Sequence, residues 1–570
     1  MKSAVAVLAA ASVVLGGSVV DLGHARYEGF VDAHNITNFL GIRYAAAPIG
    51  KFFLVRQSLN SILIGNLRWQ APASPPSVPG IQQSTSQPAK CYQSIVGNSS
   101  IPNPVLARRD IEESEDCLFL SVYSPSLAPT KLLPTLVWIH GGGYALGAAS
   151  DYNGTELALE SNKNIVVVVL QYRLGLFGFL AGDQVHEDGV ANAGLLDQDF
   201  ALRWINKNIE KFGGDPNRVT IWGQSAGAGS VLQHVLANSG KTKPQLFRYA
   251  MTSSTYIPPQ YPYNHWVPQV GPKCLSFAPM LTHGQALFNE VAELTGCPNS
   301  TTLACLRDAD AETLQTVNID MSIASYFGTL PFTPVVDGTF IVENPIAQLS
   351  QGKVNGEAYY AVTNTNEGVI FVDGADVSNA TAYACDVLPA LTLQQDAKVA
   401  QIYASLGSPL EQAQTIMKEL EFVCPSFYAL AAFPGKSYKV TSRWYPAWFF
   451  TDPLQAQFTV PPALHGDDIA YYFPSFDGFG TPTPPFNNTD FINAFVGGFL
   501  SFTLNGNPND KLAPTIAPTW PVWSNVAAEE LVFNKTDTAV PEPAIEVQRV
   551  DAGMLERCEF WKQLRITTSL

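Results

Sequence analysis

Ser225 stands at the centre of a Gly-x-Ser-x-Gly pattern, whose residues could bring a hydroxyl group to a carbonyl carbon. The apolar run over 219–222 predicts a buried strand, and the small residues after it predict a helix over 225–236. Gly223 and Gly227 permit the tight strand-to-helix turn that exposes such a serine. The pattern alone arises often by chance, but this context favours a nucleophile for acyl transfer.

A second glycine-rich stretch, His140-Gly141-Gly142-Gly143, follows an apolar run over 133–139 that predicts a strand. Its backbone N–H groups can approach a reacting carbonyl closely because glycine has no side chain. We therefore expect this stretch to stabilise the negative charge that develops on the carbonyl oxygen. Together the two stretches predict serine-dependent acyl transfer.

The serine needs a histidine to take its proton and a carboxylate to orient that histidine. Eight histidines compete for the role of base. His465 is favoured because it lies in a loop where Gly466 leaves the imidazole unshielded; a surface histidine in an acidic turn is the alternative. His140 belongs to the glycine-rich stretch, and His234 falls inside the helix after the nucleophile.

Glu367 is the candidate for the carboxylate. It follows a strand predicted over 358–362 and lies between the serine and the histidine in the chain. The order Ser…Glu…His is the one that the α/β-hydrolase arrangement uses. Local sequence alone leaves three rivals, Asp373, Asp467 and Asp468.

Strands and helices alternate around these candidates. Apolar runs predict strands over 133–139 and 165–170, and a helix over 195–212 carries its apolar residues on one face before Gly213-Gly214 ends it. This order predicts an α/β fold with a mostly parallel central sheet flanked by helices. Sites in such sheets lie at the carboxyl ends of the strands, where the candidates fall.

Composition favours a globular enzyme with a large core. Hydrophobic residues make up 46% of the 570 residues and charged residues 14%, and we expect one catalytic domain over 19–570. A net charge of −16 argues against nucleic acid as a partner. None of the eight cysteines has the paired spacing of a zinc site, so neither a metal nor a cofactor is expected.

The first 18 residues resemble a secretory signal peptide, with Lys2, an apolar run over 4–15 and small residues at 16–18. That run is shorter than the roughly 20 residues of a membrane span, and no later segment reaches that length. A secreted, extracellular protein is therefore expected. Asn-x-Ser/Thr glycosylation acceptors agree with this; they begin at Asn35, Asn98, Asn153, Asn299, Asn379, Asn487 and Asn534.

Export also favours disulfides. Local spacing favours the pairs Cys91–Cys117 and Cys297–Cys305, and it leaves the remaining cysteines open.

Residues 51–65 interrupt the chain between Gly50 and Asn66 in an unusual way. Without them, the chain would run Ala47-Pro48-Ile49-Gly50 straight into Asn66-Leu67-Arg68-Trp69. The block can be encoded with an in-frame donor and acceptor of splicing. One hypothesis is therefore that it is a translated, unspliced intron; a surface insertion, which loops tolerate well, is the alternative.

The whole set of motifs resembles the type-B carboxylesterase/lipase family, which includes the cholinesterases and secreted fungal carboxylesterases and lipases. The resemblance implies an α/β-hydrolase fold. It also implies that Ser225 is the nucleophile, Glu367 the acid and His465 the base, with oxyanion N–H groups from Gly142, Gly143 and Ala226. The motifs that carry it are Gly41–Ala45, Glu115–Leu118, His140–Gly143, Asn192–Asp197, Phe212–Pro216, Gly223–Gly227, Asn366–Gly368 and His465–Asp468.

The resemblance further implies that Cys91 and Cys117 close a loop over the active-site gorge. It also implies that Cys558 pairs with an upstream cysteine, for which Cys424 is the candidate. Cys274 and Cys385 could join each other or stay free.

Two departures from the family pattern bear on the substrate. Gln224 stands where many members carry a glutamate, which removes one attraction for cationic substrates. The loop between Cys91 and Cys117 is shorter than the lid of the fungal lipases, which favours soluble or short-chain esters.

The resulting expectation is a secreted serine carboxylic-ester hydrolase that acts on a small-molecule or lipid ester through an acyl-enzyme. The alternative among enzymes is a triacylglycerol lipase with interfacial activation. A more distant alternative is a non-catalytic, cholinesterase-like binding protein, but such proteins typically lack the nucleophile.

Overall fold

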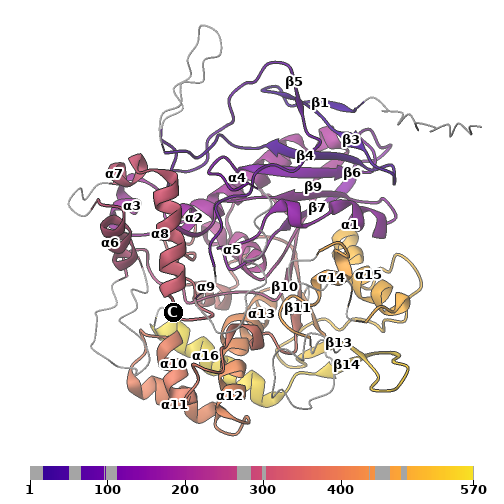
Figure 1. Cartoon of the computed structure of the whole chain (residues 1–570). Helices are drawn as coiled ribbons and strands as arrows, with labels where there is room; N and C mark the ends of the chain where they lie inside the picture. The colour runs from indigo at the N-terminus through magenta and orange to yellow at the C-terminus, as the bar shows by residue number, and fades with distance from the viewer. Residues whose placement is uncertain are drawn as a thin grey trace, which may run out of the picture.

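A computed structural model describes residues 17–50, 66–95, 97, 112–265, 284–297, 303–434, 437–442, 463–476, 484 and 486–568. These residues form a large sheet in the order β14-β13-β12-β11-β10-β9-β7-β8-β6-β4-β3 (Figure 1). The strands are β3 (Phe30–Val31), β4 (Thr37–Arg43), β6 (Phe119–Ser124), β7 (Leu133–Ile139), β8 (Val166–Leu170), β9 (Gly214–Gln224), β10 (Tyr249–Ser253), β11 (Ala358–Asn364), β12 (Ser437–Ser442), β13 (Glu529–Lys535) and β14 (Pro543–Arg549).

The strands from β8 to β13 pair in parallel, and the pairs at both edges of the sheet are antiparallel. Every residue of β8, β10 and β11 is buried. Strands covered on both faces need continuous apolar runs, which explains why β8 reads Val-Val-Val-Val-Leu. A smaller sheet combines β1 (Val19–Asp21), β2 (Arg26–Glu28) and β5 (Ile81–Gln83).

Helices cover both faces of the large sheet. They are α1 (Gly154–Glu160), α2 (Gly175–Phe179), α3 (Asp183–Asp188), α4 (Ala193–Asn208), α5 (Ala226–Gly240), α6 (Gln285–Leu294), α7 (Leu303–Asp308), α8 (Ala311–Ala324), α9 (Pro345–Ser350), α10 (Ala380–Val387), α11 (Leu393–Tyr403), α12 (Pro409–Lys418), α13 (Cys424–Ala431), α14 (Ile469–Tyr472), α15 (Thr489–Asn505) and α16 (Ala552–Thr568).

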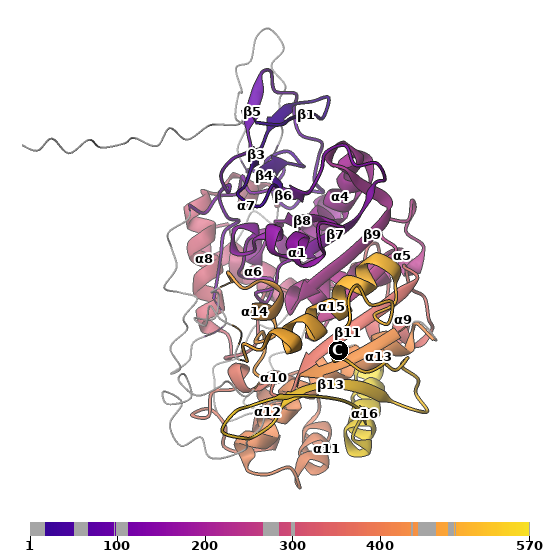
Figure 2. The same cartoon turned by 90° about the vertical axis from the view of Figure 1, so that its right-hand side faces the viewer.

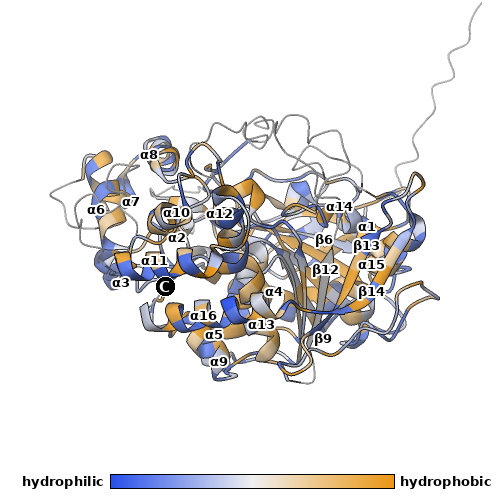
Figure 3. Ribbon diagram, turned by 90° about the horizontal axis from the view of Figure 1, so that it is seen from below, coloured by the Kyte–Doolittle hydropathy of each residue, from blue (hydrophilic) through white to orange (hydrophobic). Residues whose placement is uncertain are grey.

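Two hydrophobic clusters separate the faces of the sheet. Helices α1, α14 and α15 contribute to the cluster that contains Trp138 and Trp222, and they lie on the side turned to the viewer in Figure 2. Helices α4, α5 and α13 contribute to the other cluster, which contains Val137 and Ile221. Neighbouring residues of one strand thus face opposite clusters, as the alternation of side chains requires. The outer helices, among them α11 and α16, carry both hydrophilic and hydrophobic residues (Figure 3).

The elements expected from the sequence are present, with small shifts at their ends. Strand β7 coincides with the predicted strand, β8 begins one residue later than predicted, and β9 and β11 are longer than predicted. The helix predicted over 195–212 is α4 followed by a 3-10 turn at Ile209–Phe212. Helix α5 begins at Ala226, and its regular part ends before Ala237, where the backbone leaves helical geometry.

Two of the motifs supply buried ion pairs that connect distant segments. Arg68 Nε lies 2.5 Å from Glu115 Oε1, and Arg173 Nη2 lies 2.7 Å from Asp197 Oδ1; Arg68, Arg173 and Asp197 are buried, and Glu115 is largely buried. Losing one partner of such a pair typically costs about 3–5 kcal/mol because the other charge stays buried. These motif residues therefore belong to the scaffold and not to the reacting centre.

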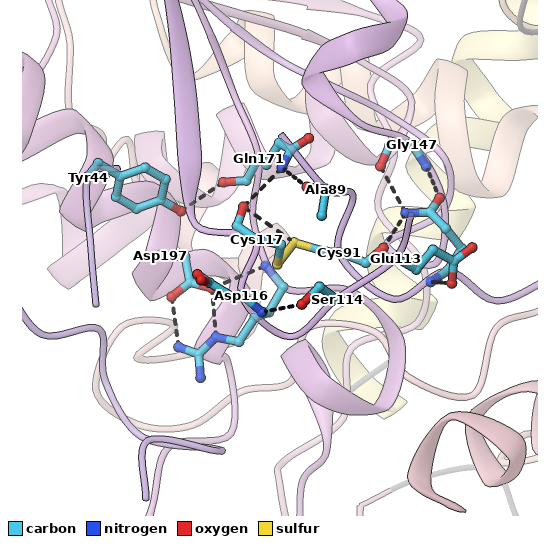
Figure 4. The surroundings of a disulfide bond; sticks show 12 residues. Tyr44, Ala89, Cys91, Glu113, Ser114, Asp116, Cys117, Gly147, Gln171 and Asp197 are labelled. Atoms are coloured by element: carbon cyan, nitrogen blue, oxygen red, sulfur yellow. Dashed lines mark hydrogen bonds and ion pairs between the residues drawn. A yellow bond between two sulfur atoms is a disulfide. The ribbon is translucent and has the colours of Figure 1, made fainter. Parts of the chain in front are cut away.

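Three disulfides join pairs of cysteines within the described residues: Cys91–Cys117, Cys297–Cys305 and Cys424–Cys558. The first two are the pairs favoured by local spacing, and the third is the pair that the resemblance implied. Around the first, the Gln171 side-chain amide donates hydrogen bonds to the carbonyls of Ala89 and Cys117, both at 3.0 Å (Figure 4). Cys385 is also disulfide-bonded.

Several expectations fall on other parts of the chain. The main part of the leader (1–16), the block 51–65, Cys274, and the acceptors Asn98 and Asn299 lie outside the described residues. Among the remaining acceptors, Asn534 is half-buried, and four are exposed: Asn35, Asn153, Asn379 and Asn487. Within the described ranges, no helix has the length and apolar character to cross a membrane.

Candidate active site

Ser225 occupies the sharp turn between β9 and α5. Its backbone has φ 57° and ψ −127°, a conformation that non-glycine residues rarely adopt and that functional sites often hold. A Cβ atom on Gly227 would lie 2.0 Å from the Ile139 carbonyl oxygen, and one on Gly223 would lie 2.4 Å from the Gly227 carbonyl carbon. Both glycines are therefore required by close packing, as the sequence pattern predicted. The Ser225 N–H donates a hydrogen bond to the Ser253 carbonyl oxygen over 2.9 Å.

His465 and Glu367 meet on the adjoining loops. Nδ1 of His465 lies 2.6 Å from Oε2 of Glu367, and both side chains are buried. Oε1 of the same carboxylate accepts the Asn364 N–H at 2.6 Å, at the end of β11. The two loops are tied together because the Asn366 N–H donates to the Ala463 carbonyl at 3.1 Å. The carboxylate is thus fixed from one side and oriented toward the imidazole on the other.

The three rival carboxylates have other partners. Asp373 accepts the Ala375 N–H at 2.9 Å in its own turn. Asp467 accepts the Leu464 N–H at 2.7 Å, and burial raises the pKa of its carboxyl to about 7.

The side chain of Asp468 is more deeply buried than that of Asp467. It accepts hydrogen bonds from the Asn364 side-chain amide at 2.9 Å and from the Tyr472 hydroxyl, and burial raises the pKa of its carboxyl. Among the four candidates, Glu367 is the one that contacts His465 Nδ1. Asp467 and Asp468 hold the loop that carries the histidine.

The other ring nitrogen of His465 faces the nucleophile turn. Its Nε2 lies 3.2 Å from the side-chain amide nitrogen of Gln224, the residue before Ser225. Within the described residues, no hydrogen bond joins Ser225 Oγ to the imidazole. Catalytic hydrogen bonds are often formed only when substrate is bound, so this geometry is compatible with proton transfer.

Two aromatic rings enclose the imidazole. The ring centroid of Phe371 lies 4.9 Å from that of His465 in an edge-on arrangement, and the centroid of Phe422 lies 4.6 Å away. Phe422 comes from a π-helical turn, η5 (Glu419–Val423), before α13. Sequence reasoning did not find these rings: Phe371 follows Glu367 by four residues, which was the one signal present, and a π-helical turn has no periodic signature.

The glycine stretch approaches the nucleophile directly. Gly142 and Gly143 have φ values of 101° and 65°, in the left-handed region that favours glycine. A Cβ atom on Gly141 would lie 3.1 Å from the Ser225 Cβ atom, so the two stretches are in contact. Ala226 is the first residue of α5, and its N–H therefore has no acceptor within the helix.

The contacts of His140 indicate a structural role for this side chain. Its ring stacks on Tyr172 with centroids 4.5 Å apart, and Nδ1 lies 2.9 Å from the Gly141 carbonyl oxygen. Burial lowers the pKa of His140 to about 4, so it is neutral at pH 7. The buried His234 ring lies 3.0 Å from the Gln198 side-chain oxygen on α4. Neither ring has the buried carboxylate partner that His465 has.

A mostly parallel sheet with a serine turn, a glycine stretch and a histidine–carboxylate pair at the ends of its strands defines an α/β hydrolase. Residues 18–561 match the Carboxylesterase family, and the chain belongs to that family. It is accordingly a carboxylic ester hydrolase.

Relatives of known type agree with this. Carboxylesterase 1E of Mus musculus is 30% identical over 523 residues, covering 85% of this chain and 84% of the relative. Secreted lipase 1 of Botryotinia fuckeliana (strain B05.10) is 30% identical over 535 residues, covering 86% and 85%. The crystal structure of Aspergillus niger EstA has a TM-score of 0.75 at 27% identity, covering 97% of this chain and 99% of that chain.

Proposed function

We propose that the protein is a secreted serine carboxylesterase in which Ser225, His465 and Glu367 act as one catalytic unit, carried by a single domain over 19–570. The observation that carries the proposal is the 2.6 Å contact between buried Glu367 and His465 Nδ1, on loops beside the strained Ser225 turn. A carboxylate at Nδ1 fixes the tautomer whose Nε2 can accept a proton.

In the first half of the reaction, His465 Nε2 takes the hydroxyl proton while Ser225 Oγ bonds to the ester carbonyl carbon. The carbonyl oxygen becomes an oxyanion, and the N–H groups of Gly142, Gly143 and Ala226 stabilise it. Glu367 stabilises the imidazolium. His465 then returns the proton to the alkoxy oxygen as the C–O bond breaks, so the alcohol leaves and Ser225 remains acylated.

Water completes the cycle. His465 takes a proton from the water molecule while its oxygen attacks the acyl carbon, and the same N–H groups stabilise the second oxyanion. Collapse breaks the bond to Ser225 Oγ, which recovers its proton from His465. The carboxylic acid leaves and the resting enzyme is restored. These steps require only the side chains and backbone groups named above.

The comparisons favour an ester as the substrate but divide on its size. A carboxylesterase and a secreted lipase are each 30% identical to the chain. We favour soluble or short-chain esters because the loop closed by Cys91 and Cys117 spans only 26 residues. The secreted relative keeps a triacylglycerol lipase as the second candidate.

Secretion and glycosylation are part of the same proposal. The disulfides fit an oxidising compartment, and four glycosylation acceptors are exposed. In a eukaryotic host the protein should accumulate in the medium and lose mass on treatment with an N-glycosidase. Retention inside the cell as an unmodified chain would contradict this part of the proposal.

Hydrolysis of p-nitrophenyl esters from acetate to palmitate tests the activity. We expect the highest kcat/KM on short chains, and a loss in kcat on the order of 10⁴- to 10⁶-fold in Ser225→Ala and His465→Ala. Activity on long chains that rises sharply above the solubility limit would establish the lipase instead. Ser225→Ala with wild-type activity would overturn the assignment of the nucleophile.

A further inference from the structure

Gln224 contacts the ring nitrogen that must accept the serine proton. It is the last residue of β9, it is buried, and its Nε2 lies 3.2 Å from His465 Nε2. Because Glu367 faces Nδ1 at 2.6 Å, the proton of the neutral imidazole resides on Nδ1, and Nε2 carries a lone pair. In the free enzyme the amide N–H of Gln224 can therefore donate to this lone pair, and it must release the lone pair when Ser225 transfers its proton.

We propose that Gln224 is a positioning residue that holds neutral His465 with Nε2 toward the nucleophile turn, and thereby extends ester hydrolysis to lower pH. The inference rests on the proposed function of Ser225 and His465. A donor to the lone pair stabilises the neutral ring and disfavours the imidazolium. Activity in the free enzyme is lost when His465 becomes protonated, so a neutral ring that persists to lower pH keeps the enzyme active there.

The other groups that face the imidazole act from different sides. Glu367 binds Nδ1, and the buried carboxyl of Asp468 is held by Asn364 and Tyr472. Asp467 binds the Leu464 N–H, and the rings of Phe371 and Phe422 pack against the imidazole. The group that contacts Nε2 is the uncharged amide of Gln224. A change at this position therefore alters the Nε2 side while the Nδ1 side stays the same.

Gln224→Glu has nearly the same shape but places a carboxylate beside Nε2. An opposite charge within about 4–6 Å favours the charged form of a titratable group, here the imidazolium. Gln224→Met keeps the length of the side chain and removes the donor. Without the donor the acidic limb of activity should move in the same direction, but by less than in Gln224→Glu.

The test is the pH profile of kcat/KM for p-nitrophenyl acetate, followed at the isosbestic wavelength of p-nitrophenol. We expect the acidic limb to move up by about one to three pH units in Gln224→Glu and by a smaller amount in Gln224→Met. Gln401→Glu adds the same charge on the exposed side of α11 and should keep the wild-type limb. The pH dependence of Ser225 modification by a fluorophosphonate should shift in parallel.

A role in filling space would leave the acidic limb unchanged in Gln224→Met, since methionine occupies similar volume. The inference is overturned if Gln224→Met keeps the wild-type limb, whatever Gln224→Glu does, or if Gln401→Glu moves the limb as far as Gln224→Glu. If the glutamate variant does not fold, the methionine variant still decides, because it is neutral. Failure of the proposed function would be seen separately, as undiminished hydrolysis in Ser225→Ala.

Discussion

The N–H group of Leu67 donates a hydrogen bond to the carbonyl oxygen of Ile49 over 3.1 Å, although 17 positions separate the two residues in the chain. If residues 51–65 were absent, Ile49, Gly50, Asn66 and Leu67 would be consecutive. The same hydrogen bond would then be the one that closes a four-residue β-turn. The residues on the two sides of the block therefore already share the hydrogen bond that a turn without the block would form.

A variant that lacks residues 51–65 should therefore fold and hydrolyse p-nitrophenyl acetate within a few-fold of the full chain, because shortening a loop lowers its closure entropy cost. Its Tm should equal or exceed that of the full chain. A deletion of the same length over 55–69 removes buried Arg68 and Trp69 and should not fold.

The retained-intron hypothesis also predicts which mRNA sequence is the major one. Transcripts sequenced across the codons for Gly50 and Asn66 should mostly lack the block. A major transcript that retains it, together with a deletion variant that does not fold, would mean that the block belongs to the native protein.

Glu367→Gln should cost about 10⁴-fold in kcat, by analogy with neutralising the acid of other serine triads. The Asn364 N–H at 2.6 Å keeps an oxygen at the Oε1 position, so the new amide would present its NH₂ group to His465 Nδ1. That contact favours the tautomer with the proton on Nε2, which cannot accept a proton from Ser225.

The control for this prediction is Glu367→Asp, which keeps the charge and should lose less activity than Glu367→Gln. Steady-state kinetics on p-nitrophenyl butyrate measures both variants. Activity of the glutamine variant within tenfold of wild type would contradict a role for Glu367 at Nδ1.

The turn around Ser225 could be predicted from sequence because close packing leaves room only for hydrogen at Gly223 and Gly227. The sheet could be predicted because strands buried on both faces need continuous apolar runs. The carboxylate could not be chosen locally, because Glu367 lies in a polar turn after a strand while Asp467 and Asp468 lie beside His465 in the sequence. The choice depends on the pairing of the Asn366 and Leu464 segments, which lie almost a hundred residues apart in sequence.

Gly142→Ala should lower kcat by about 10²- to 10³-fold, the typical cost of losing one oxyanion donor. A Cβ atom at Gly142 would lie 2.4 Å from the Leu146 carbonyl oxygen, so the loop must shift and its N–H groups would leave their positions. Gly338→Ala is the matched control. Its φ of 74° imposes similar backbone strain, but no atom of the described residues lies within 4 Å of the added methyl group.

We expect Gly338→Ala to lose about 1–2 kcal/mol of folding stability and to keep wild-type kcat. Kinetics and thermal unfolding of the two variants separate strain from chemistry. Equal kcat in Gly142→Ala and wild type would remove Gly142 from the oxyanion hole.

Glu421 should make the fold less stable as the pH rises. Burial raises the pKa of its carboxyl to about 8, an effect that nearby Arg565 partly offsets. The folded protein therefore keeps this proton while the unfolded chain loses it near the ordinary value of 4.5. The stability contribution is complete below that value and is lost as the pH rises through about 8.

Thermal unfolding should show a falling Tm for wild type between pH 5 and pH 9, and a shallower fall for Glu421→Gln, which stays neutral. Glu187→Gln, at an exposed position, should follow the wild-type curve, and parallel curves for Glu421→Gln and wild type would show that the buried carboxyl does not carry this pH dependence.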